Sequence, residues 1–527
     1  MLVNTKPEVV GPERPVVLYA TEWQRWMWAS VGLAMALRLA FVFITANQGT
    51  DAGARYHIAQ ELLKNPWQAP SEVWLPLHFW FLGLVLRMWN SELALRLATA
   101  VIGGLTLLPF WGLIRRAFDS RIAVVSSFCL AVFGIHIGYS VMTSSETLTI
   151  FLLTCTLYAW VRFRSGESAR WAVLAGALLS AACLIRYEPW VLIPLLAALS
   201  FDDMRVWLPS NRVRLRGAVC FLASASAGAL AWSLFSYAKW GDALASAHGT
   251  MWMNETSPTA MLQSPVYRSV VVPGALLASL GPMLAALAVA GLWKGLARPL
   301  SSKGALAAVA VVLAGTNYAN AIVNYVTQAR YTIIYSWLLI PFGVYAVCNL
   351  QRASHPRRLR HWLAATFLLF FVWQAAIAVA AEYTPCSIGD RLGRLSPMLP
   401  LRCDLRQLVS WMNAHPRGGA AIVDNVNYEA AEVQRFAHLS VAFVTPFVVN
   451  DPTPLEKHVA EFVRTQKPTV LVYSPHGQLG RIWSLPDTSD VTLQRAGIEL
   501  KLHCLWQDED YRVYAIEYPG PAASESR

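Results

Sequence analysis

The sequence predicts a polytopic α-helical membrane protein of about eleven spans, followed by a soluble α/β domain. Of its 527 residues, 55% are hydrophobic and only 14% are charged, whereas soluble domains carry about 25% charged residues. The mean hydropathy is +0.40. The apolar residues gather in runs long enough to cross a bilayer, which takes about 20 residues of helix. Beyond about residue 383 the chain becomes polar.

Eleven apolar segments are the candidate spans. They cover about 22–46, 92–114, 121–140, 146–162, 170–186, 188–201, 214–238, 271–293, 304–325, 330–349 and 361–381. The first segment is longer than the apolar region of a cleavable signal and has no clear small-residue cleavage site. We therefore interpret it as an uncleaved anchor, and residues 1–382 as one membrane domain, with a first loop and juxtamembrane helices at about 47–91.

A further apolar stretch, Trp74 to Trp89, decides the topology. If it does not cross, basic residues concentrate in the loops on one side, at 115–121, 162–170, 205–216, 294–303 and 352–360. The short loops on the other side then keep only Arg186, Lys239, Arg268 and Arg330. Because cytoplasmic loops are enriched in Lys and Arg, this pattern favours a juxtamembrane or re-entrant helix at 74–89. The net charge of +11 reflects the same bias and does not indicate a nucleic-acid partner.

The region 383–527 is predicted to be an α/β domain on the non-cytoplasmic side, because eleven crossings separate it from an inside N-terminus. Helices are expected at 404–414 and 454–466, and buried strands at 420–423, 441–444 and 470–473. Residues 500–506 and 512–518 predict a terminal hairpin. Alternating helices and strands are typical of an α/β fold. In an oxidising compartment, Cys386 and Cys403 are candidates for a disulfide.

In this topology, polar side chains next to the helix ends converge on the outside face. The set comprises Asp51, Arg55, Tyr56, His57 and Lys64 in the first loop, Glu146 at a span start, Arg186 and Glu188 in a turn, Arg330 and Tyr331 at a later span, and His248 in an outside loop. Each has a purely structural explanation. Glu146 suits a helix N-terminus, Arg186 and Glu188 an interfacial ion pair, and Arg330 a snorkelling side chain. His78 is expected to pack.

The coincidence of these residues on one face still favours a site, since ionisable groups at the membrane are costly. A carboxylate can act as general base for an acceptor hydroxyl, and cations can hold a departing phosphate. These groups suit transfer of a sugar from a lipid phosphate. A polytopic lipid or solute transporter, or flippase, is the alternative, although we find no internal repeat of the kind such proteins carry.

The sequence resembles the GT-C glycosyltransferases, specifically the protein O-mannosyltransferase and lipid A aminoarabinose transferase group. The resemblance covers most of residues 20–350. It rests on Asp51 with Arg55–Ala59 and Trp74–His78, on Ser144–Leu148 with Leu184–Pro189, and on Ala329–Tyr331. Two departures are evident. Asp51 is followed by Ala52, where many members have Asp-Glu, and Glu146 stands where some members have Asp.

The resemblance implies an inverting hexosyl- or pentosyltransferase of the plasma (inner) membrane. Its donor would be a polyprenyl-phosphate monosaccharide and its acceptor a protein, lipid or glycan. Asp51 would deprotonate or orient the acceptor hydroxyl, with Glu146 in support. Arg55, Arg186 and Arg330, and more weakly His57 and Lys64, would bind the donor phosphate. Tyr56, Glu188, Tyr331 and His248 would contact acceptor or sugar. We find no metal-ligand cluster and expect no cofactor.

Overall fold

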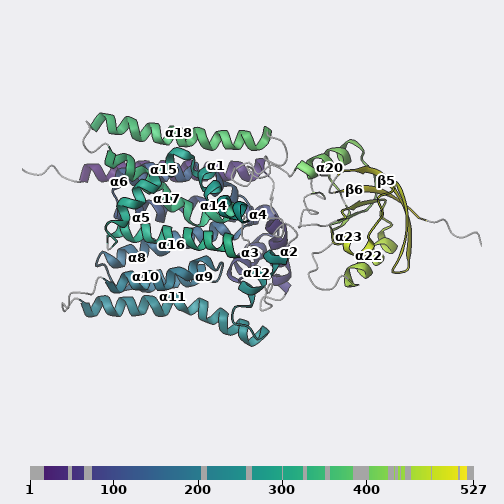
Figure 1. Ribbon diagram of the computed structural model, residues 1–527, viewed down its shortest axis with the longest axis horizontal. Coiled ribbons are helices and arrows are strands. Elements are labelled where there is room, and N and C mark those ends of the chain that lie inside the picture. Colours follow the sequence, from purple (N-terminus) through teal and green to yellow (C-terminus); the bar gives the residue numbers. More distant parts are fainter. Residues whose placement is uncertain are drawn as a thin grey trace, which may run out of the picture.

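The computed structural model describes most of the chain. The described residues are 17–45, 50–64, 74–202, 211–256, 264–299, 301–324, 329–350, 356–383, 403–424, 433, 437–439, 441–444, 453–475, 477–508 and 511–518. They form a bundle of long helices and a smaller domain built on a sheet, which lies beyond the end of the bundle where α2, α3 and α12 are found (Figure 1). The expected fold class is confirmed.

The bundle consists of helices that follow one another along the chain. Its first half contains α1 (Val17–Ile44), α2 (Thr50–Lys64), α3 (Leu77–Met88), α4 (Glu92–Leu105), α5 (Leu107–Ala117), α6 (Ser120–Ala131), α7 (Gly134–Ser140), α8 (Ser145–Arg164), α9 (Arg170–Cys183), the 3-10 helix η1 (Glu188–Val191) and α10 (Leu192–Asp202). Its second half contains α11 (Asn211–Trp240), α12 (Ala245–Thr256), α14 (Pro265–Leu280), α15 (Pro282–Leu296), α16 (Ser302–Val323), the 3-10 helix η2 (Ala329–Thr332), α17 (Ile333–Leu350) and α18 (Pro356–Tyr383).

Every segment expected to cross the membrane coincides with a helix or with two consecutive helices. Within the described residues, six helices are long and apolar enough to span a bilayer, or up to eight if each bent pair counts as one span. Helices α9 and α10 are shorter, and α3 has 12 residues. At 1.5 Å per residue α3 is about 18 Å long, which is less than the hydrocarbon thickness of about 30 Å. This length fits a non-crossing 74–89 segment, but α9 and α10, which we expected to cross, have similar lengths of 14 and 11 residues.

Two apolar helix pairs are sharply bent, which differs from the continuous helices expected at 121–140 and 271–293. Helices α6 and α7 meet at 57°, and α14 and α15 meet at 106°. Gly281, with φ of 77°, ends α14, and Pro282 begins α15. Glycine adopts this positive φ at little cost, and proline removes a backbone donor. Together they turn the chain where the apolar pattern alone predicts one helix.

One glutamine side chain, that of Gln374, forms hydrogen bonds with the backbone at both bends. The Gln374 side chain of α18 accepts a hydrogen bond from the Gly134 backbone N–H (2.9 Å) and donates to the Ser279 carbonyl (2.8 Å). Gly134 is the first residue of α7, and Ser279 lies in the last turn of α14. Backbone groups freed at a break inside a membrane need partners within the protein. Gln374 supplies them and ties α18 to both broken helices.

Two buried arginines hold the chain around α7. The Arg38 guanidinium of α1 donates to the Ala131 carbonyl (3.2 Å) at the end of α6 and contacts His136 Nδ1 (2.6 Å) in α7. The Arg96 guanidinium of α4 donates to the Val141 carbonyl (2.7 Å), just after α7. Both side chains are at most 2% exposed. The path from α6 through α7 to α8 is therefore fixed by hydrogen bonds to other helices.

The second domain is a six-stranded sheet in the order β2-β1-β3-β6-β5-β4. Its elements are α20 (Cys403–Ala414), β1 (Ala421–Val423), β2 (Ala442–Val444), α22 (Thr453–Gln466), β3 (Val470–Tyr473), α23 (Gly480–Trp483), β4 (Asp490–Arg495), β5 (Ile498–Gln507) and β6 (Arg512–Glu517). The strands β2, β1 and β3 are parallel, and β3, β6, β5 and β4 are antiparallel. Two apolar clusters form its core.

The predicted helices and strands of this domain are all present, but β4 was not expected. Only Leu493 is buried along β4, so the strand has too few apolar positions to stand out in the sequence. It lies at the edge of the sheet and pairs only with β5. The proposed disulfide lies outside the described residues, since Cys386 and the side chain of Cys403 are not among them.

Glycines allow close helix contacts, and one of them gives a test of the packing. A Cβ at Gly291 of α15 would lie 2.1 Å from the Phe342 carbonyl oxygen of α17, whereas one at Gly274 of α14 would meet no atom within 4 Å. We expect Gly291→Ala to separate α15 from α17 and to destabilise the protein by about 1–3 kcal/mol. Thermal unfolding of the purified protein in detergent measures this.

Gly274→Ala is the matched control, since it makes the same change in a neighbouring helix without a clash. It should be neutral or stabilising by about 0.5–1 kcal/mol, because alanine loses less backbone entropy in a helix. Equal unfolding temperatures for the two variants would contradict the packing between α15 and α17.

Candidate functional site

A compact charged cluster forms where α8, the turn after α9, and η2 meet. Glu146 lies in the first turn of α8, Arg186 lies in the turn between α9 and η1, Glu188 is the first residue of η1, and Arg330 lies in η2. The free N–H groups at a helix N-terminus favour a carboxylate in the first turn, which suits Glu146. Residues separated by more than 180 positions in the sequence, from Glu146 to Arg330, are thus brought together.

Arg186 is at the centre of this cluster. Its Nη1 donates to Glu146 Oε1 (3.0 Å) and to Ser145 Oγ (3.2 Å). Its Nε and Nη2 donate to Glu188, with Nη2 2.5 Å from Oε1. A guanidinium presents several donors in one plane and can serve two carboxylates at once. Arg186 therefore joins the start of α8 to η1.

Arg330 and Tyr331 complete the cluster from η2. Arg330 Nε is 4.0 Å from Glu146 Oε1, a longer contact than that of Arg186. The Tyr331 ring centroid lies 5.0 Å from the Arg186 guanidinium carbon and 5.2 Å from that of Arg330. Both distances are within cation–π range. Tyr331 therefore holds the two guanidinium groups on one side of the site.

Burial makes these ion pairs costly to break. The Glu146 side chain is 2% exposed, and those of Arg186 and Arg330 are 10% and 15% exposed. Removing one member of a buried pair costs about 3–5 kcal/mol, because the other charge remains unpaired. Two carboxylates and two guanidinium groups give the four residues no net charge. An anion that binds here needs either a rearrangement of these pairs or a further cation.

The first-loop helix α2 contacts the segment that leads into α8, three residues before Glu146. Thr143 Oγ1 donates to the Ala52 carbonyl at 2.8 Å, which links the residue after Asp51 to the residues that lead into α8. The backbone of Asp51 is thus placed at the start of α2, close to this cluster. The side chains of Asp51, His57 and Lys64 lie outside the described residues, so their contacts are not assigned.

Arg55 occupies an aromatic recess at the same end of the bundle. Its Nη1 is 3.1 Å from His78 Nδ1, and its guanidinium carbon lies 5.0 Å from the Trp74 ring and 5.4 Å from the Phe79 ring. The Arg55 side chain is 5% exposed and His78 is 1% exposed. The recess adjoins the cluster, because the backbone of Leu77, next to His78, is bonded to the carbonyl of Leu184, two residues before Arg186.

His78, Trp74 and Ser145 are the residues that our sequence reasoning did not place in a site. We expected His78 to pack, and it does so, but its partner is the charged Arg55. The backbone explains the proximity, since Leu77 N–H donates to the Leu184 carbonyl at 3.0 Å and docks α3 next to the Arg186 turn. The Pro-Leu-His sequence at the start of an apolar helix is the signal that could have indicated a role for His78 in the site.

Tyr56 and His248, which we predicted to contact the acceptor or the sugar, have hydrogen-bond partners outside the cluster. The Tyr56 hydroxyl accepts a hydrogen bond from Gln60 Nε2 at 2.8 Å, within α2. His248 Nδ1 pairs with Asp242 at 2.7 Å, and its side chain is 60% exposed. Over the described part of the chain, no hydrogen bond or ion pair joins His248 to Glu146, Arg186 or Arg330. Likewise, no three His, Cys, Asp or Glu residues are grouped as metal ligands there.

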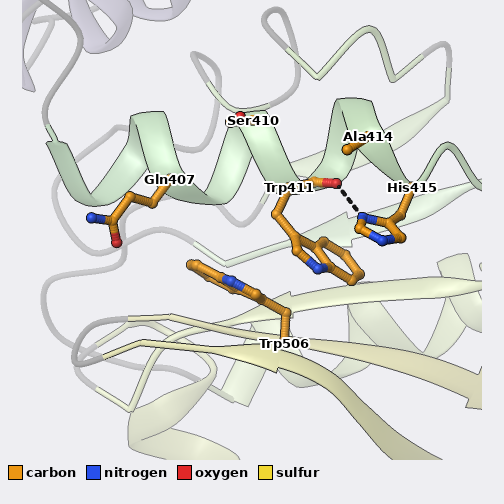
Figure 2. A pocket seen from close by; sticks show the side chains of 6 residues that line it. All are labelled: Gln407, Ser410, Trp411, Ala414, His415 and Trp506. Atoms are coloured by element: carbon orange, nitrogen blue, oxygen red, sulfur yellow. Dashed lines mark hydrogen bonds between the residues drawn. The ribbon is translucent and has the colours of Figure 1, made fainter.

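The sheet domain has a broad hollow of about 620 Å³ between α20 and the end of β5. It is lined by Gln407, Ser410, Trp411, Ala414, His415 and Trp506, and the Trp411 indole lies between the His415 and Trp506 rings (Figure 2). This lining contains no carboxylate and only one titratable side chain, His415. It lacks the acid–base pairs present at Glu146, so the charged cluster is the better candidate for chemistry.

Comparison with known proteins supports the resemblance noted in the sequence. Residues 68–232 match the family described as dolichyl-phosphate-mannose-protein mannosyltransferase. This segment includes α3, Glu146, Arg186 and Glu188. No curated protein sequence matches the chain significantly.

Solved structures share the fold at low sequence identity. ArnT from Cupriavidus metallidurans, bound to undecaprenyl phosphate, has a TM-score of 0.57 and 15% identity, with 93% of this chain and 98% of that chain covered. Its apo state has a TM-score of 0.53 and 15% identity, with 94% and 98% covered. The Archaeoglobus fulgidus oligosaccharyltransferase, in complex with Zn and sulfate, has a TM-score of 0.50 and 14% identity, with 85% and 68% covered. The chain therefore has the GT-C glycosyltransferase fold, and its residues 68–232 are similar to the dolichyl-phosphate-mannose-protein mannosyltransferase family.

Proposed function

We propose that this protein transfers one monosaccharide from a polyprenyl-phosphate donor to an acceptor hydroxyl, with inversion at the anomeric carbon. The observation that carries the proposal is the placement of Glu146 within reach of Arg186 and Arg330, directly beside the start of α2, where Asp51 lies. Acids for an acceptor and cations for a phosphate are thus found together. The fold and the family match support the same class of reaction.

The proposed reaction is a single displacement. The acceptor O–H gives its proton to the Asp51 carboxylate, and the oxygen attacks the anomeric carbon on the face opposite the phosphate. The new C–O bond forms as the bond between the anomeric carbon and the phosphate oxygen breaks, and the electron pair leaves with the polyprenyl phosphate. The lipid phosphate gains one negative charge. Cations near that oxygen stabilise the transition state more than the ground state.

The three arginines are suited to different parts of this reaction. Arg186 is bonded to two carboxylates, so we assign it to holding Glu146 and Glu188 in position. Arg330 has the longer, 4.0 Å contact with Glu146, and we assign it as the first candidate phosphate ligand. Arg55, held by rings on α3 and the segment before it, is the second candidate phosphate ligand. Both guanidiniums could bind a phosphate in bidentate fashion.

The carboxylate substitutions test the assignment of acid–base groups. We expect Asp51→Asn to lower the rate of sugar transfer roughly 10²- to 10⁴-fold, which is the range for loss of a general base. Glu146→Gln should lower it less, since Glu146 is already bonded to Arg186. Transfer of labelled sugar from the lipid-phosphate donor, measured in membranes at saturating donor, reports both. Normal turnover by a well-folded Asp51→Asn protein would rule out its assigned role.

The phosphate assignment is tested by Arg330→Gln. We expect roughly a 10²-fold loss of transfer, together with weaker binding of the product polyprenyl phosphate. Lys239→Gln is the matched control, because Lys239 is an exposed cation at the end of α11 and lies outside the cluster. If both variants retain the affinity for polyprenyl phosphate, Arg330 does not bind it.

We also propose that the transfer needs no divalent cation, since Glu146 and Glu188 are both occupied by Arg186. Exhaustive treatment with EDTA should leave the rate of transfer unchanged. A loss of activity that Mg²⁺ or Mn²⁺ restores would show that a metal takes part.

A further inference from the structure

The far end of α8 has a second charged site, which the proposed reaction does not use. Helix α8 has 20 residues and is about 30 Å long, close to the thickness of a bilayer core. Glu146 lies in its first turn. A pocket of about 340 Å³ lies between its last turns and α5. Its lining consists of Trp111, Gly112, Arg115, Arg116 and Tyr158.

The pocket depends on the close approach of α5 and α8. A Cβ at Gly112 would lie 2.7 Å from Tyr158 Cε2, so only glycine lets the Tyr158 ring lie against α5. Trp111 is 8% exposed and forms a second aromatic wall. The Arg115 guanidinium carbon lies 5.0 Å from the Trp111 ring, and that of Arg116 lies 5.9 Å from the Tyr158 ring. Each arginine is thus held against an aromatic wall.

The charges around this pocket are not balanced. Glu167, in the loop after α8, bonds Arg116 at 2.8 Å and Arg162 at 2.5 Å. Arg115 has no carboxylate within ion-pair distance among the residues that the structure describes. Three guanidinium groups therefore face one carboxylate, which leaves an excess of two positive charges. Glu167 links two of the arginines and so fixes the shape of the site from the loop side.

An anion with a phosphate group fits these features. Guanidinium groups bind phosphate through paired, charge-assisted hydrogen bonds, and tryptophan and tyrosine are enriched where helices leave the bilayer. Basic pockets between membrane helices are known to bind phospholipid head groups. Snorkelling arginines alone need no aromatic walls and no bridging glutamate. The pocket lies at the ends of α5 and α8, where Arg115 and Arg116 are exposed to a lipid head group.

We propose that this pocket binds the phosphate of an anionic membrane phospholipid, held between Arg115 and Arg116. This site is separate from the Glu146 cluster at the other end of α8. The proposal does not depend on the sugar-transfer reaction, because lipid binding can be measured without a donor or an acceptor.

The test uses the full-length protein reconstituted in vesicles of equal amounts of phosphatidylglycerol and phosphatidylcholine. After mild extraction, native mass spectrometry counts the lipids that remain bound. We expect the wild type to keep phosphatidylglycerol in preference to phosphatidylcholine. The double variant R115Q/R116Q should lose this preference, with binding weakened roughly 30-fold, about fivefold for each guanidinium.

Arg298→Gln is the matched control, because Arg298 is an exposed cation in the loop before α16 that does not line the pocket. It should keep the wild-type preference. Since Arg116 has a structural partner in Glu167, Arg115→Gln alone provides a variant that leaves every ion pair of the pocket intact. It should weaken phosphatidylglycerol binding roughly fivefold.

Three outcomes would overturn the proposal. The first is equal retention of the two lipids by the wild type. The second is an equal loss in Arg298→Gln, which would indicate a general charge effect. The third is displacement of phosphatidylglycerol by glycerol 3-phosphate at similar concentration, which would indicate a site for a soluble phosphate.

Discussion

The ion pair between Arg186 and Glu146 is the interaction on which the rest of the site depends. Both side chains are nearly buried, and a buried carboxylate is stable only with a partner. Because Arg186 also binds Glu188 and packs on Tyr331, the start of α8, η1 and η2 can only assemble together. The same ion pairs that join these elements also position the carboxylate of Glu146.

Several buried polar side chains of the bundle form hydrogen bonds with backbone groups and lie outside the candidate site. Gln374, Arg38 and Arg96 bind carbonyl and N–H groups around the break between α6 and α7. An ionisable group inside a membrane protein is a functional candidate by default, yet here the structure gives these side chains a clear structural partner. Their effect on the site is indirect. They direct α7 so that Thr143 reaches the carbonyl of Ala52.

The two ends of α8 differ in charge. At its first turn the carboxylates and guanidiniums balance, which is why the proposed reaction assigns the donor phosphate to Arg330 and Arg55. At its last turn the cations exceed the carboxylate, which favours a permanent anion. A single helix of 20 residues therefore carries a charged cluster with no net charge at one end and a positively charged pocket at the other.

The sequence by itself determined where the apolar helical segments lie, the charge asymmetry of the loops and most strands of the sheet domain, although six to eight helices, and not eleven, are long and apolar enough to span a bilayer within the described residues. These follow from local periodicity and from apolar runs, and the membrane restricts the possible structures to helices. It also indicated Glu146, Arg186 and Arg330 as a set. Only the tertiary structure decided that Arg186 bonds both carboxylates, that His78 meets Arg55, and that two apolar helix pairs bend at Phe133 and Gly281. Those features depend on contacts between residues far apart in the chain, such as Gly134 with Gln374, which no local pattern records.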